Sequence, residues 1–164
     1  MGYHCLMKEL QTTLLLVIKD HKILLAEKKR GFGAGKFNGA GGKLEPGETV
    51  EQAMVRETQE EIAITPTKYQ KCGVVKFDTY KDGVPTMVVT HIYTADAYVG
   101  EPQESEEMKP QWFDLDKIPY DQMYATDTLW LPLIIEGKGY FEAEFKYAPD
   151  GALLNQKITF KPEK

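Results

Sequence analysis

The chain has 164 residues, of which 42% are hydrophobic and 27% are charged, a composition typical of a globular rather than a disordered protein. Its formal net charge of −5 disfavours a general nucleic-acid-binding protein, since such proteins are usually basic. No apolar run approaches the roughly 20 residues of a membrane-spanning helix, and the N-terminus lacks a run of signal-peptide length. We therefore expect a cytoplasmic protein, a single domain over residues 1–164, with no membrane or nucleic-acid polymer as its partner.

The first half of the chain predicts a hairpin, a glycine-rich segment and a helix. Apolar runs at 12–19 and 22–28, with a turn between them, predict two antiparallel strands. The dense glycines between residues 31 and 42 predict irregular backbone that lies close to another group, or a flexible loop. The pattern at 50–62 predicts a helix, and Thr49 and Gln52 predict a capping box at its start.

The second half predicts mainly strands. They are expected at 71–80, 86–99, 111–115, 140–147 and 156–161, with an acidic loop at 100–110. A second helix within 128–136 would be distorted or shortened by Pro132. Because strands outnumber helices and alternate only loosely with them, we predict an α+β fold, with a mixed sheet and helices on its faces. Cys5 and Cys72 lack metal-ligand spacing and are expected to be reduced.

The predicted helix at 50–62 carries carboxylates on its apolar side. At about 100° per residue, Glu57 and Glu61 share a stripe with the apolar residues, and Glu60 lies on its flank. Carboxylates that face the interior lose several kcal/mol of hydration or become protonated, whereas Mg²⁺ accepts several such oxygens. An exposed acidic face, with Arg56 paired to Glu60, explains the helix alone equally well.

The segment from Gly42 to Glu61 resembles the Nudix box. After Gly42, five residues lead to Glu48, and seven more lead to Arg56-Glu57, followed by Glu60-Glu61. Every charged position of that signature is present at its spacing.

The box departs from the signature at two positions. Thr58 stands where an aliphatic residue is usual, and Ala63 stands where glycine is usual. If the backbone at residue 63 is left-handed, alanine costs ~1–2 kcal/mol more than glycine. Neither change removes a carboxylate.

The likeness extends over roughly residues 11–147, where the chain resembles the MutT-type oxidised-purine nucleoside triphosphatases of the Nudix family. This resemblance implies an α/β/α sandwich with a mixed β-sheet. It also implies hydrolysis, dependent on Mg²⁺ or Mn²⁺, of an oxidised purine nucleoside triphosphate to the monophosphate and pyrophosphate. Such a reaction cleanses the nucleotide pool, and we expect a monomer with a nucleotide as its partner.

The resemblance also assigns roles to residues. Metal ligands would be Glu57, Glu60, Glu61, Glu107 and the backbone carbonyl of Gly41. Either Glu60 or Glu61 would be the general base, and Arg56 would hold a glutamate in place. The matched substrate-binding positions are Thr13, Lys28, Asn38, Gly42, Lys43, Phe77, Tyr124, Thr126 and Asp127. Lys28 could equally be a solvated lysine at a strand end, and Thr13 and Phe77 could equally serve sheet packing.

The residues that would read the base differ from those of the resembling enzymes, which use an asparagine, a stacking tryptophan and two adjacent aspartates. Asn38 matches the asparagine, Tyr124 replaces the tryptophan, and Thr126-Asp127 replaces the aspartates. Two adjacent carboxyl groups can share a proton, and one aspartate beside a threonine cannot. We therefore expect a narrower or shifted base preference.

Two other functions stay open. The altered base-reading residues are compatible with another Nudix substrate, such as a dinucleoside polyphosphate or ADP-ribose. A catalytically silent Nudix domain that senses a ligand is a second alternative. The intact glutamates argue against it, because a silent domain has no need to keep clustered carboxylates.

Overall fold

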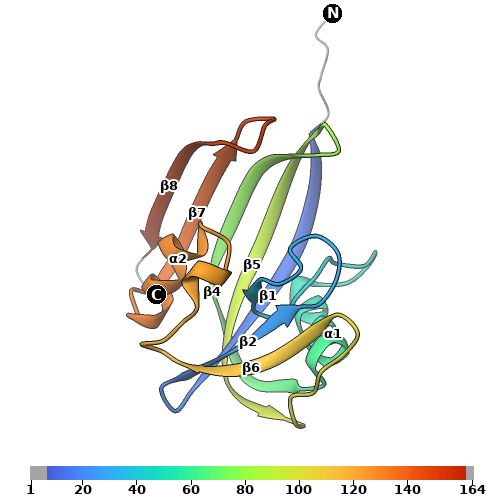
Figure 1. Ribbon diagram of the computed structural model, residues 1–164, viewed down its shortest axis with the longest axis vertical. Coiled ribbons are helices and arrows are strands. Elements are labelled where there is room, and N and C mark those ends of the chain that lie inside the picture. Colours follow the sequence, from blue (N-terminus) through green and yellow to red (C-terminus); the bar gives the residue numbers. More distant parts are fainter. Residues whose placement is uncertain (1–6, 162–164) are drawn as a thin grey trace, which may run out of the picture.

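The computed structural model describes residues 7–161, which build one mixed sheet of eight strands with helices against it (Figure 1). The strands are β1 (Lys8–Lys19), β2 (Lys22–Lys28), β3 (Phe37–Asn38), β4 (Thr65–Lys81), β5 (Val84–Val99), β6 (Met108–Asp114), β7 (Tyr140–Tyr147) and β8 (Leu153–Lys161). The helices are α1 (Val50–Ile62) and α2 (Asp127–Ile135), and a 3₁₀ turn, η1, spans Tyr120–Gln122. Cys5 lies outside the described residues.

The sheet runs in the order β3-β2-β1-β5-β4-β7-β8, and β6 pairs with β2. The pairs β1–β5 and β4–β7 are parallel, whereas the other pairs are antiparallel. The predicted mixed sheet is therefore confirmed. Strands β1, β5 and β4 lie at the centre of the sheet, and both parallel pairs involve them.

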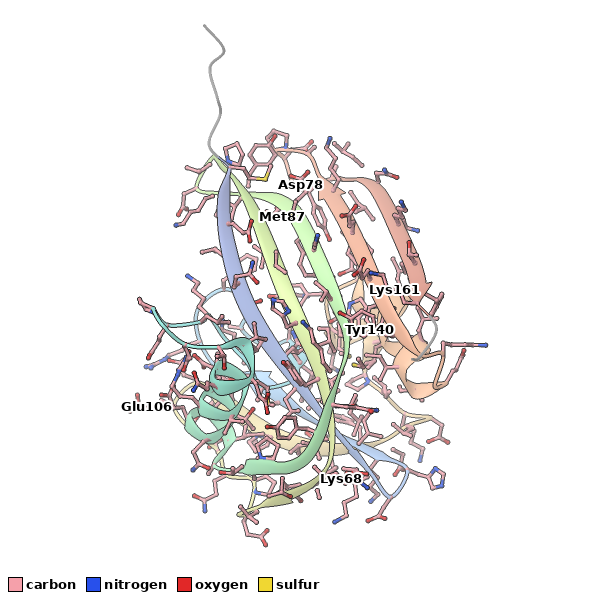
Figure 2. The ribbon with its side chains drawn as sticks, turned by 180° about the vertical axis from the view of Figure 1, so that it is seen from behind. Lys68, Asp78, Met87, Glu106, Tyr140 and Lys161 are labelled. Carbon is pink, nitrogen blue, oxygen red and sulfur yellow. The ribbon has the colours of Figure 1, made fainter. Side chains whose placement is uncertain are left out.

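The two faces of the sheet carry separate apolar cores. Successive strand residues point to opposite faces, and along β1 Leu15 and Val17 pack towards α1, whereas Leu14 and Leu16 pack towards α2. Figures 1 and 2, seen from opposite sides, show α2 and α1 on these two faces. The α/β/α sandwich predicted by the resemblance is confirmed.

Several strands extend beyond their predicted bounds. β4 begins at Thr65 instead of residue 71, and β6 begins at Met108, inside the predicted loop. The added part of β4, residues 65–70, is mostly polar, and its pairing with β5 shifts register between Pro66 and Tyr69. Such shifts interrupt the alternation of inward and outward side chains, so the sequence pattern underestimated the length of the strand. Asp78 and Met87, which pair across β4 and β5, lie on a part of the α1 face of the sheet that no helix covers (Figure 2).

Helix α1 begins and ends at the predicted residues. Thr49 Oγ1 accepts from the Gln52 backbone N–H at 3.1 Å, and Gln52 Oε1 accepts from the Thr49 N–H at 3.0 Å, which confirms the capping box. The unusual Thr58 is buried, and its hydroxyl donates to the Met54 carbonyl at 2.8 Å. The helix ends at Ala63, whose φ of 63° and ψ of 26° are left-handed.

Helix α2 is short and contains Pro132, as the sequence predicted. Proline has no N–H, so the carbonyl of Thr128, four residues earlier, receives no helical hydrogen bond from it. The helix still buries Trp130 and Leu131 against the sheet. Across the described part of the chain, no helix is long and apolar enough to span a membrane.

Ala63→Gly is expected to stabilise the protein. The left-handed backbone costs alanine ~1–2 kcal/mol, and the greater freedom of glycine in the unfolded chain offsets about 0.4–1 kcal/mol of that. The free energy of unfolding should therefore rise by about 0.5–1 kcal/mol, as measured by chemical denaturation. Ala34→Gly is the control: Ala34 is exposed with a negative φ, so this change should lower stability slightly. A loss of stability in Ala63→Gly would contradict the interpretation.

Candidate active site

The glycine-rich segment lies against β1 and faces the second half of α1. The backbone N–H groups of Thr13 and Leu15 donate to the carbonyls of Gly42 and Ala40 at 2.9 and 2.7 Å. A Cβ on Gly41 would overlap the Thr13 carbonyl oxygen, and a Cβ on Gly42 would lie 2.5 Å from the Glu57 carboxyl carbon. Glycine is therefore required at position 41, where backbone fills the space, and at position 42 it lets the Glu57 carboxylate lie directly against the loop.

Glu57 and Glu61 are the two carboxylates that face this backbone. Glu61 Oε2 accepts from the Gly41 N–H at 3.3 Å. Burial, together with the charges of Glu57 and Glu107, raises the pKa of Glu61 to about 7. Burial also raises the pKa of Glu57, although Arg56 opposes this effect. The two carboxylates therefore lie where negative charge is poorly compensated, as the helical pattern predicted.

Arg56 connects most of the charged residues of the box. Its Nε and Nη2 donate to both oxygens of Glu48, at 2.7 and 2.9 Å. Its Nη1 donates to Glu57 at 3.0 Å and to Glu60 at 3.2 Å, and Nη2 also donates to the Lys43 carbonyl at 3.1 Å. Hydrogen bonding from Arg56 lowers the pKa of Glu48 to about 2. These contacts support the predicted positioning role of Arg56.

Glu60 and Glu107, the other predicted ligands, have cationic partners. Glu60 is largely exposed and pairs with Arg56, which is the pairing expected for a simple acidic face. Glu107 accepts from Arg30 Nη2 at 2.7 Å and Nε at 3.0 Å, and this hydrogen bonding lowers its pKa. Arg30 was not among the predicted site residues.

The fit of a divalent cation rests on the oxygens around Gly41. The Gly41 carbonyl accepts no backbone hydrogen bond within residues 7–161, so its oxygen is available. Together with the poorly compensated carboxylates of Glu57 and Glu61, it forms an oxygen-only donor set of the kind that Mg²⁺ prefers. Among the described residues no three acidic, histidine or cysteine side chains form a preassembled cage.

The predicted base-reading residues lie at and just before the start of α2 and on β3, and the loop between β2 and β3 packs against one of them. The Tyr124 ring stacks on Phe32, with centroids 6.4 Å apart, and Lys36 Nζ lies 5.3 Å from the same ring. A Cβ on Gly33 would overlap the Tyr124 hydroxyl. The Asn38 side chain, on β3, accepts from the Gly39 N–H at 2.8 Å.

Asp127 is buried at the start of α2 with one carboxyl oxygen, Oδ2, unpartnered within the described chain. Burial raises its pKa to about 7; the Tyr124 backbone and the Trp130 indole, which is near but outside hydrogen-bonding geometry, offset part of this effect. Thr126 is also buried beside it. Below about pH 7, Asp127 therefore provides a neutral carboxyl group near Tyr124 that can donate or accept a hydrogen bond.

The remaining predicted substrate positions have structural surroundings of their own. Thr13 is buried on β1, and its hydroxyl has no partner in the described part of the chain. Phe77, on β4, stacks on Phe145 with centroids 5.8 Å apart, so it serves sheet packing whatever else it contacts. Lys28 is near enough to Glu61 and Glu107 to lower the pKa of each.

Sequence reasoning missed Phe32 and Lys36 as neighbours of Tyr124. Phe32 is 84% exposed although it is a large aromatic residue. The available signal for a functional role of Phe32 was its position as a large aromatic residue between two glycines in an irregular loop. Its contact with Tyr124 joins segments about ninety residues apart, which no local pattern reveals.

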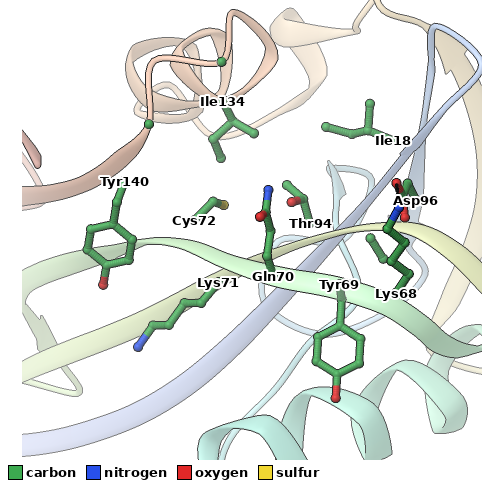
Figure 3. Close-up of a pocket in the computed structure, with 13 residues that line it drawn as sticks. Ile18, Lys68, Tyr69, Gln70, Lys71, Cys72, Thr94, Asp96, Ile134 and Tyr140 are labelled. Carbon is green, nitrogen blue, oxygen red and sulfur yellow. Dashed lines mark ion pairs between the residues drawn. The ribbon is translucent and has the colours of Figure 1, made fainter. Parts of the chain in front are cut away.

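A cavity of about 370 Å³ lies away from all these residues, where β4 has register shifts (Figure 3). Ile18, Thr94 and Ile134 line it, together with Cys72 and Tyr140. Burial raises the pKa of the Cys72 thiol to about 12, so the thiol is a poor nucleophile. None of the predicted site residues lines this cavity.

Asp127→Asn is expected to stabilise the protein in a pH-dependent way. The unfolded carboxyl ionises near pH 4, whereas the folded one stays neutral until about pH 7. The native protein therefore carries a penalty that is absent below about pH 4, grows between about pH 4 and 7, and then stays constant. The advantage of Asp127→Asn should grow by up to about 4 kcal/mol across this window. Chemical denaturation at several pH values measures it, and a constant difference would contradict the burial argument.

Comparison with known proteins agrees with this arrangement. Residues 8–134 match the family model of the NUDIX domain. Over 146 residues the chain is 52% identical to the oxidized purine nucleoside triphosphate hydrolase of Danio rerio and 41% identical to that of Mus musculus. Each alignment covers 89% of this chain and 92% of the relative.

The fold is also found in solved structures. A mutator MutT protein from Bacillus halodurans superposes with a TM-score of 0.81 and 25% sequence identity, covering 93% of this chain and 99% of that one. The family model spans α1 and its glutamates as well as the glycine-rich segment. On these grounds the chain belongs to the Nudix hydrolase family.

Proposed function

We propose that this Nudix hydrolase cleaves oxidised purine nucleoside triphosphates to the monophosphate and pyrophosphate, with Mg²⁺ as its metal and free cytoplasmic nucleotides as its substrates. The observation that carries this proposal is the contact between the Gly41–Gly42 backbone and the partly buried Glu57 and Glu61. The relatives from Danio rerio and Mus musculus, 52% and 41% identical to this chain, are named for that activity.

The chain would hold the metal with Glu57, Glu61 and the Gly41 carbonyl, joined by Glu60 and Glu107. The ion would neutralise charge on the phosphates, which is the main demand of phosphate chemistry. Water then attacks a phosphorus of the anhydride, the bond to the bridging oxygen breaks, and pyrophosphate leaves. Glu60 or Glu61 would accept the proton of that water.

Arg56 would act indirectly in this reaction. It contacts Glu48, Glu57 and Glu60 at once, so it holds the α1 carboxylates relative to the loop before the helix. Lys28 and Lys43, which both precede the α1 carboxylates in the chain, would offset the charge of the phosphates. The backbone of Gly42 would allow the phosphates to approach closely, because glycine has no Cβ.

The base would be read by Asn38, Tyr124, Thr126 and Asp127, with Thr13 and Phe77 as further proposed contacts. Tyr124 offers an aromatic ring, the group that would stack on a base, and this ring lies against Phe32. Asp127 can donate a hydrogen bond while protonated and accept one when ionised. Thr126 removes the second carboxyl group, so one aspartate alone would discriminate between purines.

Hydrolysis by purified protein with Mg²⁺ and a nucleotide panel tests the chemistry, with pyrophosphate and phosphate measured separately. Glu61→Gln should lower kcat by at least about a hundredfold, the scale of general acid–base and electrostatic contributions. It should also weaken Mn²⁺ binding, measured by electron paramagnetic resonance. Glu144→Gln is the matched control, because Glu144 is exposed on β7 away from the site.

The outcome separates this proposal from the alternatives. Turnover of ADP-ribose or a dinucleoside polyphosphate in preference to purine triphosphates would favour another Nudix substrate. No turnover of any nucleotide would favour a silent ligand sensor.

A second experiment tests the base-reading residues. The kcat/KM values for 8-oxo-dGTP and 2-hydroxy-dATP should differ in the native protein, because a single carboxyl group cannot share a proton with a neighbour. Thr126→Asp should bring the two values closer together, and Thr126→Ser should keep their ratio. Equal values in the native protein would contradict a narrowed preference.

A further inference from the structure

Four lysines that lie far apart in the sequence come together beside the candidate site. Lys8 begins β1, Lys28 ends β2, Lys43 precedes α1, and Lys81 ends β4. We call this group, Lys8, Lys28, Lys43 and Lys81, the lysine cluster. Only Lys28 and Lys43 have been considered above as substrate contacts.

Strand register places three members of the lysine cluster on one face of the sheet. Lys43 bridges Thr12 on β1, and Lys8 lies four residues before Thr12, so both point to the same face. Lys81 lies four residues after Phe77 on β4 and shares its face by the same alternation. The two strands share this face because they are linked through β5. Leu10, two residues before Thr12, pairs with Val88, and Val88 pairs with Phe77.

The ends of the relevant strands are also neighbours. Lys8 pairs with Thr86 and Lys81 pairs with Val84, two residues apart on β5. Figure 1 shows the start of β1 and the β4–β5 hairpin together at one end of the sheet. Phe77 lies on the same face, four residues along β4 from Lys81. Lys8 and Lys81 therefore border the face of the sheet on which the base is expected to lie.

The side chains of the lysine cluster are close enough to repel one another. Burial lowers the pKa of Lys81, and the charges of Lys43, Lys8 and Lys28 lower it further, with only Asp82 opposing them. No lysine of the cluster makes an ion pair within residues 7–161. The chain has 25 acidic and 20 basic residues, yet the nearby carboxylates Asp82, Glu61 and Glu107 act on the cluster only from beyond ion-pair distance. Unpaired like charges at one place are unfavourable unless an anion joins them.

We propose that Lys8 and Lys81 complete, with Lys28 and Lys43, a binding site for the polyphosphate group of the substrate. The proposal rests on the proposed function for the identity of that substrate. Lys28 connects the two regions, because it lies near both Lys81 and the carboxylates Glu61 and Glu107. The β4–β5 hairpin thereby becomes part of the substrate site, although the Nudix box lies elsewhere in the chain.

A short polyphosphate fits the lysine cluster better than a nucleic-acid polymer does. A polymer needs a basic stripe along the surface, and its binding scales with the number of phosphates contacted. Here the positive charge is confined to four side chains in a protein of net charge −5. The flanking Glu9 and Asp82 would repel a continuing strand of phosphates.

Isothermal titration calorimetry with inorganic tripolyphosphate and Mg²⁺ tests the lysine cluster directly. Lys81→Gln and Lys8→Gln should each raise the Kd about two- to fivefold, the effect of one solvent-screened charge. Lys81→Arg should restore the native affinity, because it keeps the charge. Lys157→Gln, an exposed lysine on the edge strand β8, is the matched control and should leave the Kd unchanged.

Kinetics on a nucleoside triphosphate give a second measurement. Lys81→Gln should raise KM by a similar factor and leave kcat within about twofold, because the contact is made before the chemical step as well as during it. Added salt should reduce the difference between native and Lys81→Gln protein. An unchanged tripolyphosphate Kd in Lys81→Gln, or native protein that binds a single-stranded oligonucleotide more tightly than tripolyphosphate, would overturn the proposal.

The two proposals can fail separately. Weakened tripolyphosphate binding in Lys81→Gln, without hydrolysis of any purine triphosphate, would support the lysine cluster and contradict the proposed function. Hydrolysis of oxidised purine triphosphates with unchanged tripolyphosphate binding in Lys81→Gln would do the reverse.

Discussion

The close approach of the Gly41–Gly42 backbone to both β1 and α1 is the constraint on which the site depends. One side of this segment bonds to Thr13, and the other meets Glu57 and Glu61. A Cβ at Gly41 would overlap the Thr13 carbonyl oxygen on β1, and a Cβ at Gly42 would displace the Glu57 carboxylate. Because α1 also buries Met54 and Ile62 in one of the two cores, the same approach fixes the helix, the core beneath it and the carboxylates together.

The α1 region, which this approach holds in place, was predictable from sequence because its signals are local. Helix caps, apolar spacing and the spacing of the Nudix box are all local, and they gave both ends of α1 and the glutamates that face the glycines. The strands were less well predicted, because register shifts interrupt the alternation in the added part of β4, and β6 begins in a polar segment that contains Pro110. Their length depends on pairing partners that are distant in the sequence, such as β7 beside β4.

The site divides in the same way between local and non-local information. The contact of Arg56 with Glu60, four residues later on α1, follows from helix geometry, whereas its contact with Glu48 reaches into the loop before the helix. The pairing of Arg30 with Glu107 spans 77 residues, and the convergence of lysines from four elements depends on sheet register. Asp127 is an intermediate case: the chain shows which residue is present, but only packing shows that its carboxyl group is buried without a full set of partners.

The contact between Gly33 and Tyr124 has a consequence for how such a site can change over generations. Gly33 has a φ of 83°, and any side chain there would meet the Tyr124 hydroxyl. A larger residue at position 33 is therefore acceptable only if the aromatic ring across the site becomes smaller or moves. Substitutions at position 33 and at position 124 are therefore coupled. New base preferences should arise through paired replacements at these two positions.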